Sequence, residues 1–169
     1  TIQGLLELAD IAYVGSGVLG SAVGMDKEMM KKVFRAEGLP QVAYRAVARR
    51  DWRDDPAAVQ RHIETELGYP LFFKPANLGS SVGVAKARSA DEFKAAMAEA
   101  AAYDTKIIVE AEADQCREIE CAVLGNHRPE ASLPGEVVPA NEFYDYDAKY
   151  VDDNSRLVIP APISPATTR

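Results

Sequence analysis

One segment near the middle of the chain restricts the fold more than any other. Leu71-Phe72-Phe73 is a short apolar run that predicts a buried strand, and it ends in Lys74 and Pro75. The loop 75–81 is rich in small residues, and 82–86 then has the pattern of a partner strand. The segment therefore predicts an antiparallel hairpin within a sheet.

The rest of the chain mixes helices and strands irregularly. Helices are expected at 1–8, from the N-cap Asp26 to Gly38, from Asp55 and Pro56 to Gly68, and after a capping box at 89–92. Strands are expected at 11–14, 42–48, 107–110 and 118–124. Because hairpins occur beside crossovers, we expect an α+β fold with an antiparallel sheet.

Charge and hydropathy restrict the possible partners. The 169 residues carry a net charge of −7, which argues against broad binding to nucleic acid or to an anionic membrane surface. No apolar run approaches the ~20 residues of a transmembrane helix, and no signal-peptide pattern opens the chain. We expect a cytoplasmic protein with reduced thiols at Cys116 and Cys121 and solvent-facing imidazoles at His62 and His127.

Two lysines and one loop are candidates for binding an anion. Lys27 opens a helix, where it either is a solvated charge or joins the helix N-terminus in holding an anion. Lys74 shares a strand face with Phe72 and needs a partner, which is a phosphate, a neighbouring carboxylate or solvent. The segment 77–83 is either a nest of backbone N–H groups for a phosphate or an ordinary hairpin loop.

Acidic residues on or at the end of predicted strands and one aromatic loop are further candidates for binding a ligand. The apolar run that ends at Glu110 suits a nucleobase, because the carboxylate can accept from an exocyclic amine. Glu118 lies on one strand face with Glu120, and this face either holds ribose hydroxyls or is simply solvated. The tyrosine-rich stretch 143–150 is either a lid over a site or an Ω-loop packed on its own rings.

In their order along the chain, these motifs resemble the D-alanine–D-alanine ligases of the ATP-grasp superfamily. The resemblance rests on Met25-Asp26-Lys27, the run from Lys74 to Gly83, Val109-Glu110, the run from Arg117 to Gly125, and the run from Phe143 to Tyr150. It implies the ATP-grasp central region, with an antiparallel sheet and flanking helices, incomplete at both ends. Residues 1–24 would end the N-terminal domain and its linker, 25–138 would form the nucleotide-binding subdomain, and 139–169 would hold the tyrosine-rich lid and start the C-terminal part.

The resemblance also implies a role for individual residues. The ATP phosphates would meet three lysines and a closing loop, namely Lys27, Lys74, Lys149, Gly79, Ser80, Ser81 and Val82. The adenosine would meet Glu110 at the adenine amine, backbone at Ala111 to Ala113, Glu118 at the ribose, and walls formed by Val84 and Phe143. Ser80 and Tyr150 would position the first D-alanine, and Lys149 would join them in catalysis.

The activity implied is ATP-dependent ligation of two D-alanines through a D-alanyl phosphate, for peptidoglycan precursors. The full-length enzyme would be a homodimer, and its Mg²⁺ ligands are expected in a C-terminal part that follows this sequence, so a fragment alone would be inactive. Two alternatives stay open. The first is another ATP-grasp carboxylate–amine ligase, and the second is a non-catalytic nucleotide-binding fragment.

Overall fold

The computed structural model describes residues 1–139 and 155–167, which belong to two compact units, Thr1–Glu112 and Ala113–Arg169. The units divide inside the range 25–138 that we predicted to be one subdomain, and the domain boundaries stay predictions. Helices and antiparallel sheets occur together, so the α+β class is confirmed. None of the helices in the described part of the chain combines the length and apolar content needed to cross a membrane.

The first unit is built on a four-stranded antiparallel sheet. Its strands are β1 (Tyr44–Ala48), β2 (Leu71–Pro75), β3 (Ala85–Ala87) and β4 (Lys106–Ala111), in the spatial order β1-β4-β2-β3. The predicted hairpin is confirmed as β2 and β3, in which Phe72 pairs with Lys86. The second strand starts three residues later than predicted, because Gly83 has left-handed backbone (φ 67°), which departs from the regular extended conformation of a strand.

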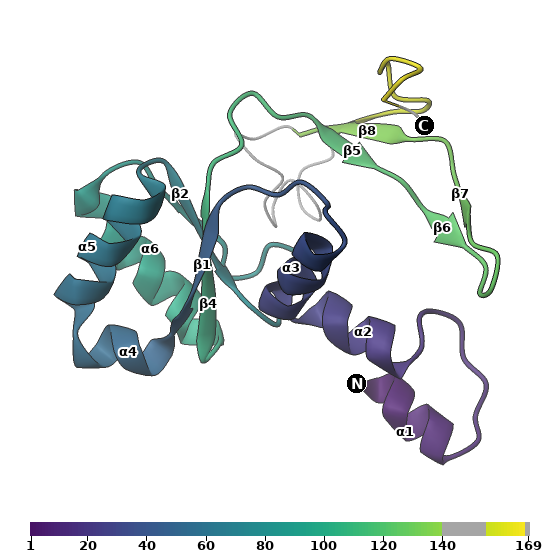
Figure 1. The fold of residues 1–169 in the computed structure, drawn as a ribbon, viewed down its shortest axis with the longest axis horizontal. Helices are drawn as coiled ribbons and strands as arrows, with labels where there is room; N and C mark the ends of the chain where they lie inside the picture. Colours follow the sequence, from purple (N-terminus) through teal and green to yellow (C-terminus); the bar gives the residue numbers. More distant parts are fainter. Residues whose placement is uncertain (140–154, 168–169) are drawn as a thin grey trace. The chain divides into compact units, whose positions relative to one another are not determined.

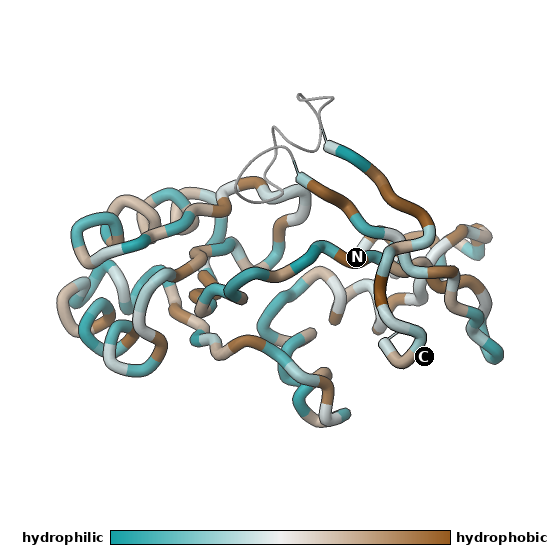
Figure 2. The backbone as a smooth tube through the Cα atoms, turned by 90° about the horizontal axis from the view of Figure 1, so that it is seen from above, coloured by the Kyte–Doolittle hydropathy of each residue, from teal (hydrophilic) through white to brown (hydrophobic). Residues whose placement is uncertain are grey.

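Three helices bury one face of this sheet (Figure 1). They are α4 (Arg49–Asp54), α5 (Pro56–Leu67) and α6 (Ala90–Tyr103). Phe73 meets Phe93 edge-on at 4.9 Å between ring centroids, and Trp52 lies 5.8 Å from Phe93. Leu71 and Ile63 are fully buried in the same core. Hydrophilic and hydrophobic stretches alternate along these helices (Figure 2), as expected where one side is buried and the other solvated.

Local signals explain where most of these helices begin and end. Asp55 caps α5 by accepting a 2.9 Å bond from the Ala58 amide, and Gly68 ends it with φ 68°, as predicted. The predicted capping box before α6 is wrong in detail. Ser89 makes no side-chain cap bond. Glu92 accepts a 2.7 Å hydrogen bond from the amide of Arg88, whereas a capping box would have it accept from the amide of Ser89.

Three helices precede the first strand in the sequence, namely α1 (Ile2–Leu8), α2 (Val18–Met25) and α3 (Lys27–Ala36). The strand predicted at 11–14 is wrong, and Ile11 and Val14 are exposed. A β-prone run forms a strand only beside a partner edge, and none of the described strands pairs with this one. The cap of α3 is confirmed, since Asp26 accepts from the amides of Glu28 and Met29.

The second unit contains short antiparallel strands. A three-stranded sheet has the order β5-β8-β9, formed by β5 (Glu118–Glu120), β8 (Gly135–Val138) and β9 (Arg156–Val158). A hairpin joins β6 (Val123–Leu124) to β7 (Glu130–Ala131). The single strand predicted at 118–124 is therefore two strands, and they pair with different partners. Cys116 and Cys121 are free and exposed, and His62 and His127 are exposed as predicted.

Replacing Gly83 should cost more stability than replacing a glycine of similar φ that has open space around it. A Cβ at Gly83 would lie 2.5 Å from Cδ2 of Tyr103 and 2.9 Å from Cγ of Pro75, whereas at Gly38, after the end of α3, it would meet nothing within 4 Å. The φ angles are 67° at Gly83 and 71° at Gly38, so both Gly→Ala changes carry a backbone strain of about 1 kcal/mol. We expect Gly83→Ala to lower the free energy of unfolding by roughly 1–3 kcal/mol more than Gly38→Ala, measured by urea denaturation. Equal losses would show that the loop yields to the extra methyl group.

Candidate functional site

The sheet face opposite α4, α5 and α6 carries the polar groups of the site. Ile107 and Val109 of β4 point into the helix-covered core, so alternation turns Lys106 and Glu110 to the other face. Helix α3 lies on that side of the sheet (Figure 1). It is joined to the end of β2 by a 2.9 Å bond from the Lys27 amide to the Ala76 carbonyl.

Glu110 is the centre of a cluster of charges on this face. Its side chain is buried, and each carboxylate oxygen has its own ammonium partner. Oε1 lies 2.8 Å from Nζ of Lys31, and Oε2 lies 2.5 Å from Nζ of Lys74. Burial would raise the pKa of Glu110, but the positive charges of Lys74 and Lys31 outweigh that effect and hold the pKa below its ordinary value. The carboxylate is therefore ionised, and Lys74 has the neighbouring acid that was one of its three predicted partners.

Lys31 is a buried member of the cluster that the sequence analysis missed. Its ammonium lies 4.9 Å from the ring centroid of Tyr44, and its backbone carbonyl accepts from Nε2 of Gln41 at 2.9 Å. Lys27 and Lys31 are four residues apart on one helix, so they share a face. That spacing, once Lys27 was singled out, is the signal that would have found Lys31.

Lys27 faces the glycine- and serine-rich loop. Its ammonium donates to the carbonyl of Leu78. Partial burial lowers the pKa of Lys27, and the positive charge of Lys74 lowers it further. The structure thus brings Lys27 and Lys74 within electrostatic reach of each other and of Glu110. An added anion would relieve the repulsion between the two ammonium groups.

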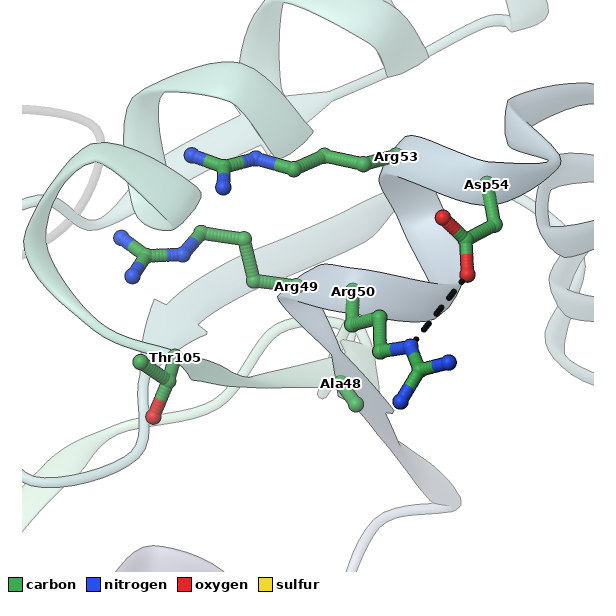
Figure 3. A pocket seen from close by; sticks show the side chains of 6 residues that line it. All are labelled: Ala48, Arg49, Arg50, Arg53, Asp54 and Thr105. Atoms are coloured by element: carbon green, nitrogen blue, oxygen red, sulfur yellow. Dashed lines mark hydrogen bonds and ion pairs between the residues drawn. The ribbon is translucent and has the colours of Figure 1, made fainter.

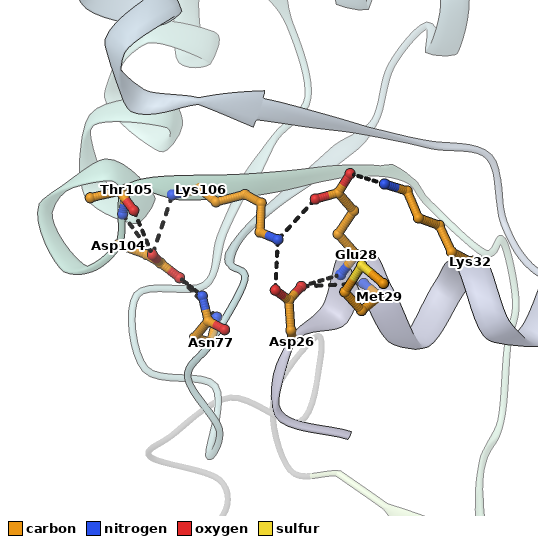
Figure 4. A network of polar contacts seen from close by, with 8 residues as sticks. All are labelled: Asp26, Glu28, Met29, Lys32, Asn77, Asp104, Thr105 and Lys106. Carbon is orange, nitrogen blue, oxygen red and sulfur yellow. Dashed lines mark hydrogen bonds and ion pairs between the residues drawn. The ribbon is translucent and has the colours of Figure 1, made fainter. Parts of the chain in front are cut away.

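The loop that follows β2 is fixed at its start by Asp104 (Figure 4). Oδ2 of Asp104 accepts from the backbone amide and the side-chain amide of Asn77, at 2.8 and 2.9 Å. Its Oδ1 accepts from the amides of Thr105 and Lys106. Ser80 and Ser81 follow with left-handed backbone, φ 53° and 59°. A loop whose base is held and whose tip leaves the usual backbone regions is suited to presenting amides to a ligand.

A second network in Figure 4 fixes α3 to the start of β4. Nζ of Lys106 lies 2.6 Å from Oδ2 of Asp26 and 2.8 Å from Oε2 of Glu28. Glu28 also pairs with Lys32 at 2.7 Å. Because Asp26 is also the N-cap, the same carboxylate that starts the helix attaches it to the sheet. This anchoring sets where Lys27 and Lys31 can reach.

An aromatic ring lies beside the charged cluster. Phe72 is half-buried and pairs across the sheet with Glu110 and with Lys86. The ammonium groups of Lys74 and Lys86 lie 5.6 and 5.4 Å from its ring centroid, and Lys86 also pairs with Glu112 at 2.6 Å. A flat apolar surface next to a carboxylate suits a planar heterocycle. Sequence reasoning placed Phe72 on this face but did not select it or Lys86.

Several predicted site residues are not part of this cluster as described. Ala111 ends β4, and Val84 precedes β3, so both adjoin the cluster in the first unit. Ala113 and Glu118 belong to the second unit, where Glu118 is exposed on β5 opposite Val137. Phe143, Lys149 and Tyr150 lie outside the described residues. Within residues 1–139 and 155–167, no group of three or more His, Cys, Asp or Glu side chains could hold a metal ion.

A pocket lined by arginines lies at the other end of β4 (Figure 3). It has a volume of about 520 Å³ and is lined by Ala48, Arg49, Arg50, Arg53, Asp54 and Thr105. Arg49 donates to the Ala101 carbonyl at 3.1 Å, and Arg50 lies 3.4 Å from Asp54. Thr105 is separated from Glu110 by roughly 16 Å of strand, at ~3.3 Å per residue. The pocket is therefore distinct from the cluster of charges around Glu110.

Acid should remove the stability that ionised Glu110 contributes. Because its folded pKa is depressed, this contribution is present above the unfolded value near 4.5 and is lost as the pH falls through the folded pKa. We expect Glu110→Gln to cost roughly 3 kcal/mol at neutral pH, where it leaves two lysines without their acid, and much less at about pH 3. Urea unfolding at both pH values tests this, with the exposed α6 residue Glu99→Gln as control. An equal cost of Glu110→Gln at both pH values would contradict it.

Comparisons with known proteins agree on one family. The family model described as "D-ala D-ala ligase C-terminus" matches residues 33–169. D-alanine--D-alanine ligase of Geobacillus kaustophilus is 55% identical over 164 residues, which are 97% of this chain and 44% of that protein. The ligase of the same name from Heliobacterium modesticaldum is 55% identical over 166 residues, 98% of this chain and 45% of its own length. The chain thus spans about half the length of the curated relatives it matches.

Solved structures give the same result for the fold. The VanG D-Ala:D-Ser ligase of Enterococcus faecalis matches 99% of this chain and 48% of its own, with a TM-score of 0.84 and 34% identity. The D-alanine-D-alanine ligase of Coxiella burnetii matches 81% of this chain and 40% of its own, with a TM-score of 0.71 and 43% identity. The sequence resemblance is therefore confirmed, and the chain belongs to the D-alanine–D-alanine ligase family of ATP-grasp proteins.

Proposed function

We propose that this chain provides the nucleotide-binding part of an enzyme that uses ATP to join two D-alanines for peptidoglycan precursors. The observation that carries the proposal is the gathering of Lys27 and Lys74 beside Glu110 on one sheet face. Family membership and the names of the relatives at 55% identity support the choice of substrate. The proposed setting is the cytoplasm, with the complete enzyme as a homodimer.

ATP fits the residues of the cluster. Its phosphates would lie against Lys27 and Lys74, under the loop of Gly79, Ser80, Ser81 and Val82. The adenine would lie against Phe72 and Val84, with its amine toward Glu110 and its ring edge toward the backbone of Ala111. The positive charge of two partly desolvated lysines is worth more here than in water, because fewer water dipoles screen it. Ala113, Glu118 and Phe143 are the further adenosine contacts that we propose.

The proposed reaction has two steps. A carboxylate oxygen of the first D-alanine attacks the terminal phosphorus of ATP, the bond to the bridging oxygen breaks, and ADP leaves. The amine of the second D-alanine, after losing a proton, attacks the acyl carbon and expels phosphate. The lysines neutralise the phosphate oxygens and hold them in line, which is how proteins accelerate phosphoryl transfer. Loop closure would keep water from the acyl phosphate.

Other residues of the proposed mechanism follow from family membership. Ser80 and Tyr150 would position the first D-alanine, and Lys149 would approach the terminal phosphates. Mg²⁺ would accompany ATP and supply Lewis-acid chemistry at the phosphates, but the described residues offer no cluster that fits it. The steps assigned above are therefore those of the lysines and the loop alone.

A second candidate function differs only in the second substrate. VanG, the structural neighbour with a TM-score of 0.84, is named a D-Ala:D-Ser ligase. The chain is 34% identical to VanG but 55% identical to a relative named D-alanine--D-alanine ligase, which favours D-alanine as the second substrate. Phosphate release by the complete gene product with D-alanine alone, compared with D-alanine plus D-serine, separates the two. We expect D-alanine alone to give full turnover, and a requirement for D-serine would select the second candidate.

Lys74→Met should weaken ATP binding, whereas the same substitution at an exposed lysine should leave the affinity for ATP unchanged. Losing one charge-assisted contact to a phosphate lowers affinity by roughly 10- to 100-fold. Lys94→Met is the matched control, because Lys94 is exposed on α6, the helix that covers the opposite face. Calorimetric titration of the chain with ATP measures both variants. An unchanged affinity in Lys74→Met would contradict the proposed site.

A further inference from the structure

The two lysines on Glu110 differ in their access to solvent. The side chain of Lys31 is 10% exposed and that of Glu110 is 9% exposed, while Lys74 is 28% exposed. Lys31 therefore approaches the carboxylate from inside the packed unit, and Lys74 approaches it from the accessible side. Lys74 can turn toward a ligand by giving up its pair with Glu110, whereas Lys31 would also have to leave the packed interior.

Several contacts keep Lys31 where it is. Its ammonium lies over the Tyr44 ring, and the guanidinium of Arg35 lies 5.2 Å from the same ring centroid. Gln41 donates to its backbone carbonyl. Helix α3 itself is fixed by the Asp26 cap and by the pairing of Asp26 with Lys106. Lys31 is thus a permanent neighbour of Glu110.

If the proposed function is right, a ligand that binds Lys74 removes a counter-ion from Glu110. When Lys74 turns to an ATP phosphate, Glu110 loses one of its two counter-ions while it stays buried. A buried carboxylate without a counter-ion is strongly unfavourable, so Glu110 would resist the exchange if Lys74 were its only partner. The 2.8 Å pair with Lys31 removes this resistance, because it leaves the carboxylate neutralised after Lys74 departs.

We propose that Lys31 is a positioning residue that acts as the resident counter-ion of Glu110 and so releases Lys74 to the ATP phosphates. Lys31 itself touches no phosphate. Before ATP binds, Glu110 is paired with both lysines, which keeps Lys74 close to the place where the phosphates bind. After ATP binds, Lys31 is the counter-ion that Glu110 keeps, and the oxygen that Lys74 has left faces the adenine amine. The exchange moves one ammonium group from a carboxylate oxygen to a phosphate oxygen without exposing a buried charge.

Lys31→Met tests the proposal because it removes the charge and keeps an unbranched apolar chain. With no resident counter-ion, Glu110 should retain Lys74, and the affinity for ATP should fall by roughly tenfold. Adenosine has no phosphate and should bind as tightly as it does to the unchanged chain. Lys31→Arg should keep most of the ATP affinity. Lys32→Met is the control on the same helix, since Lys32 is exposed and pairs with Glu28.

The same change in a Glu110→Gln background separates an electrostatic role from a structural one. Once the carboxylate is neutral it no longer retains Lys74, so adding Lys31→Met should cause no further loss of ATP affinity. Calorimetric titration of the 169-residue chain with ATP and with adenosine measures all variants, and thermal unfolding checks that each is folded.

Three results would overturn the proposal. They are unchanged ATP affinity in Lys31→Met, an equal loss for ATP and adenosine, and an undiminished loss in the Glu110→Gln background. These results differ from a failure of the proposed function, in which the unchanged chain binds no ATP or Lys74→Met binds it equally well.

Discussion

The structure of this chain depends on how one buried carboxylate is neutralised. Glu110 lies in β4, one of the two inner strands of the sheet, and pairs with Lys31 of α3 and Lys74 of β2. Neither lysine would be stable so close to the other without the acid between them. One ionised side chain therefore joins a helix to two strands and also concentrates positive charge at the place where a phosphate would bind.

One face of the sheet forms the apolar core that stabilises the fold, and the other face carries the polar groups of the site. The side that holds Phe73 and Val109 is an apolar core under three helices, and it fixes the strand positions. The other side holds polar groups whose geometry follows from those strands. Asp104 fixes the start of the loop through Asn77, and Asp26 fixes α3 through Lys106. The lysines are thus positioned by ion pairs attached to a rigid sheet, which limits the reorganisation that ligand binding requires.

Much of the fold could be predicted from the sequence where the signals are local. The hairpin at Lys74 and the caps at Asp26 and Asp55 all depend on residues a few positions apart. Helix α4 was missed because it starts at Arg49 without a side-chain cap, and its first amide bonds to the distant Thr105 carbonyl.

The site could be predicted only in part for the same reason. Lys27 and Lys74 stand beside recognisable helix and loop signals, so sequence reasoning selected them. The importance of Lys31 rests on its contact with Glu110, which lies on a distant strand and becomes a neighbour only through the sheet. The strand predicted at 11–14 failed in the opposite way, because its local pattern suits a strand but the described fold gives it no partner edge.

A crystal structure of the chain with a non-hydrolysable ATP analogue tests the central claim most directly. The account predicts phosphate oxygens within hydrogen-bonding distance of the ammonium groups of Lys27 and Lys74, with Glu110 still paired to Lys31. Phosphates bound away from both lysines, with Lys74 still on Glu110, would contradict it.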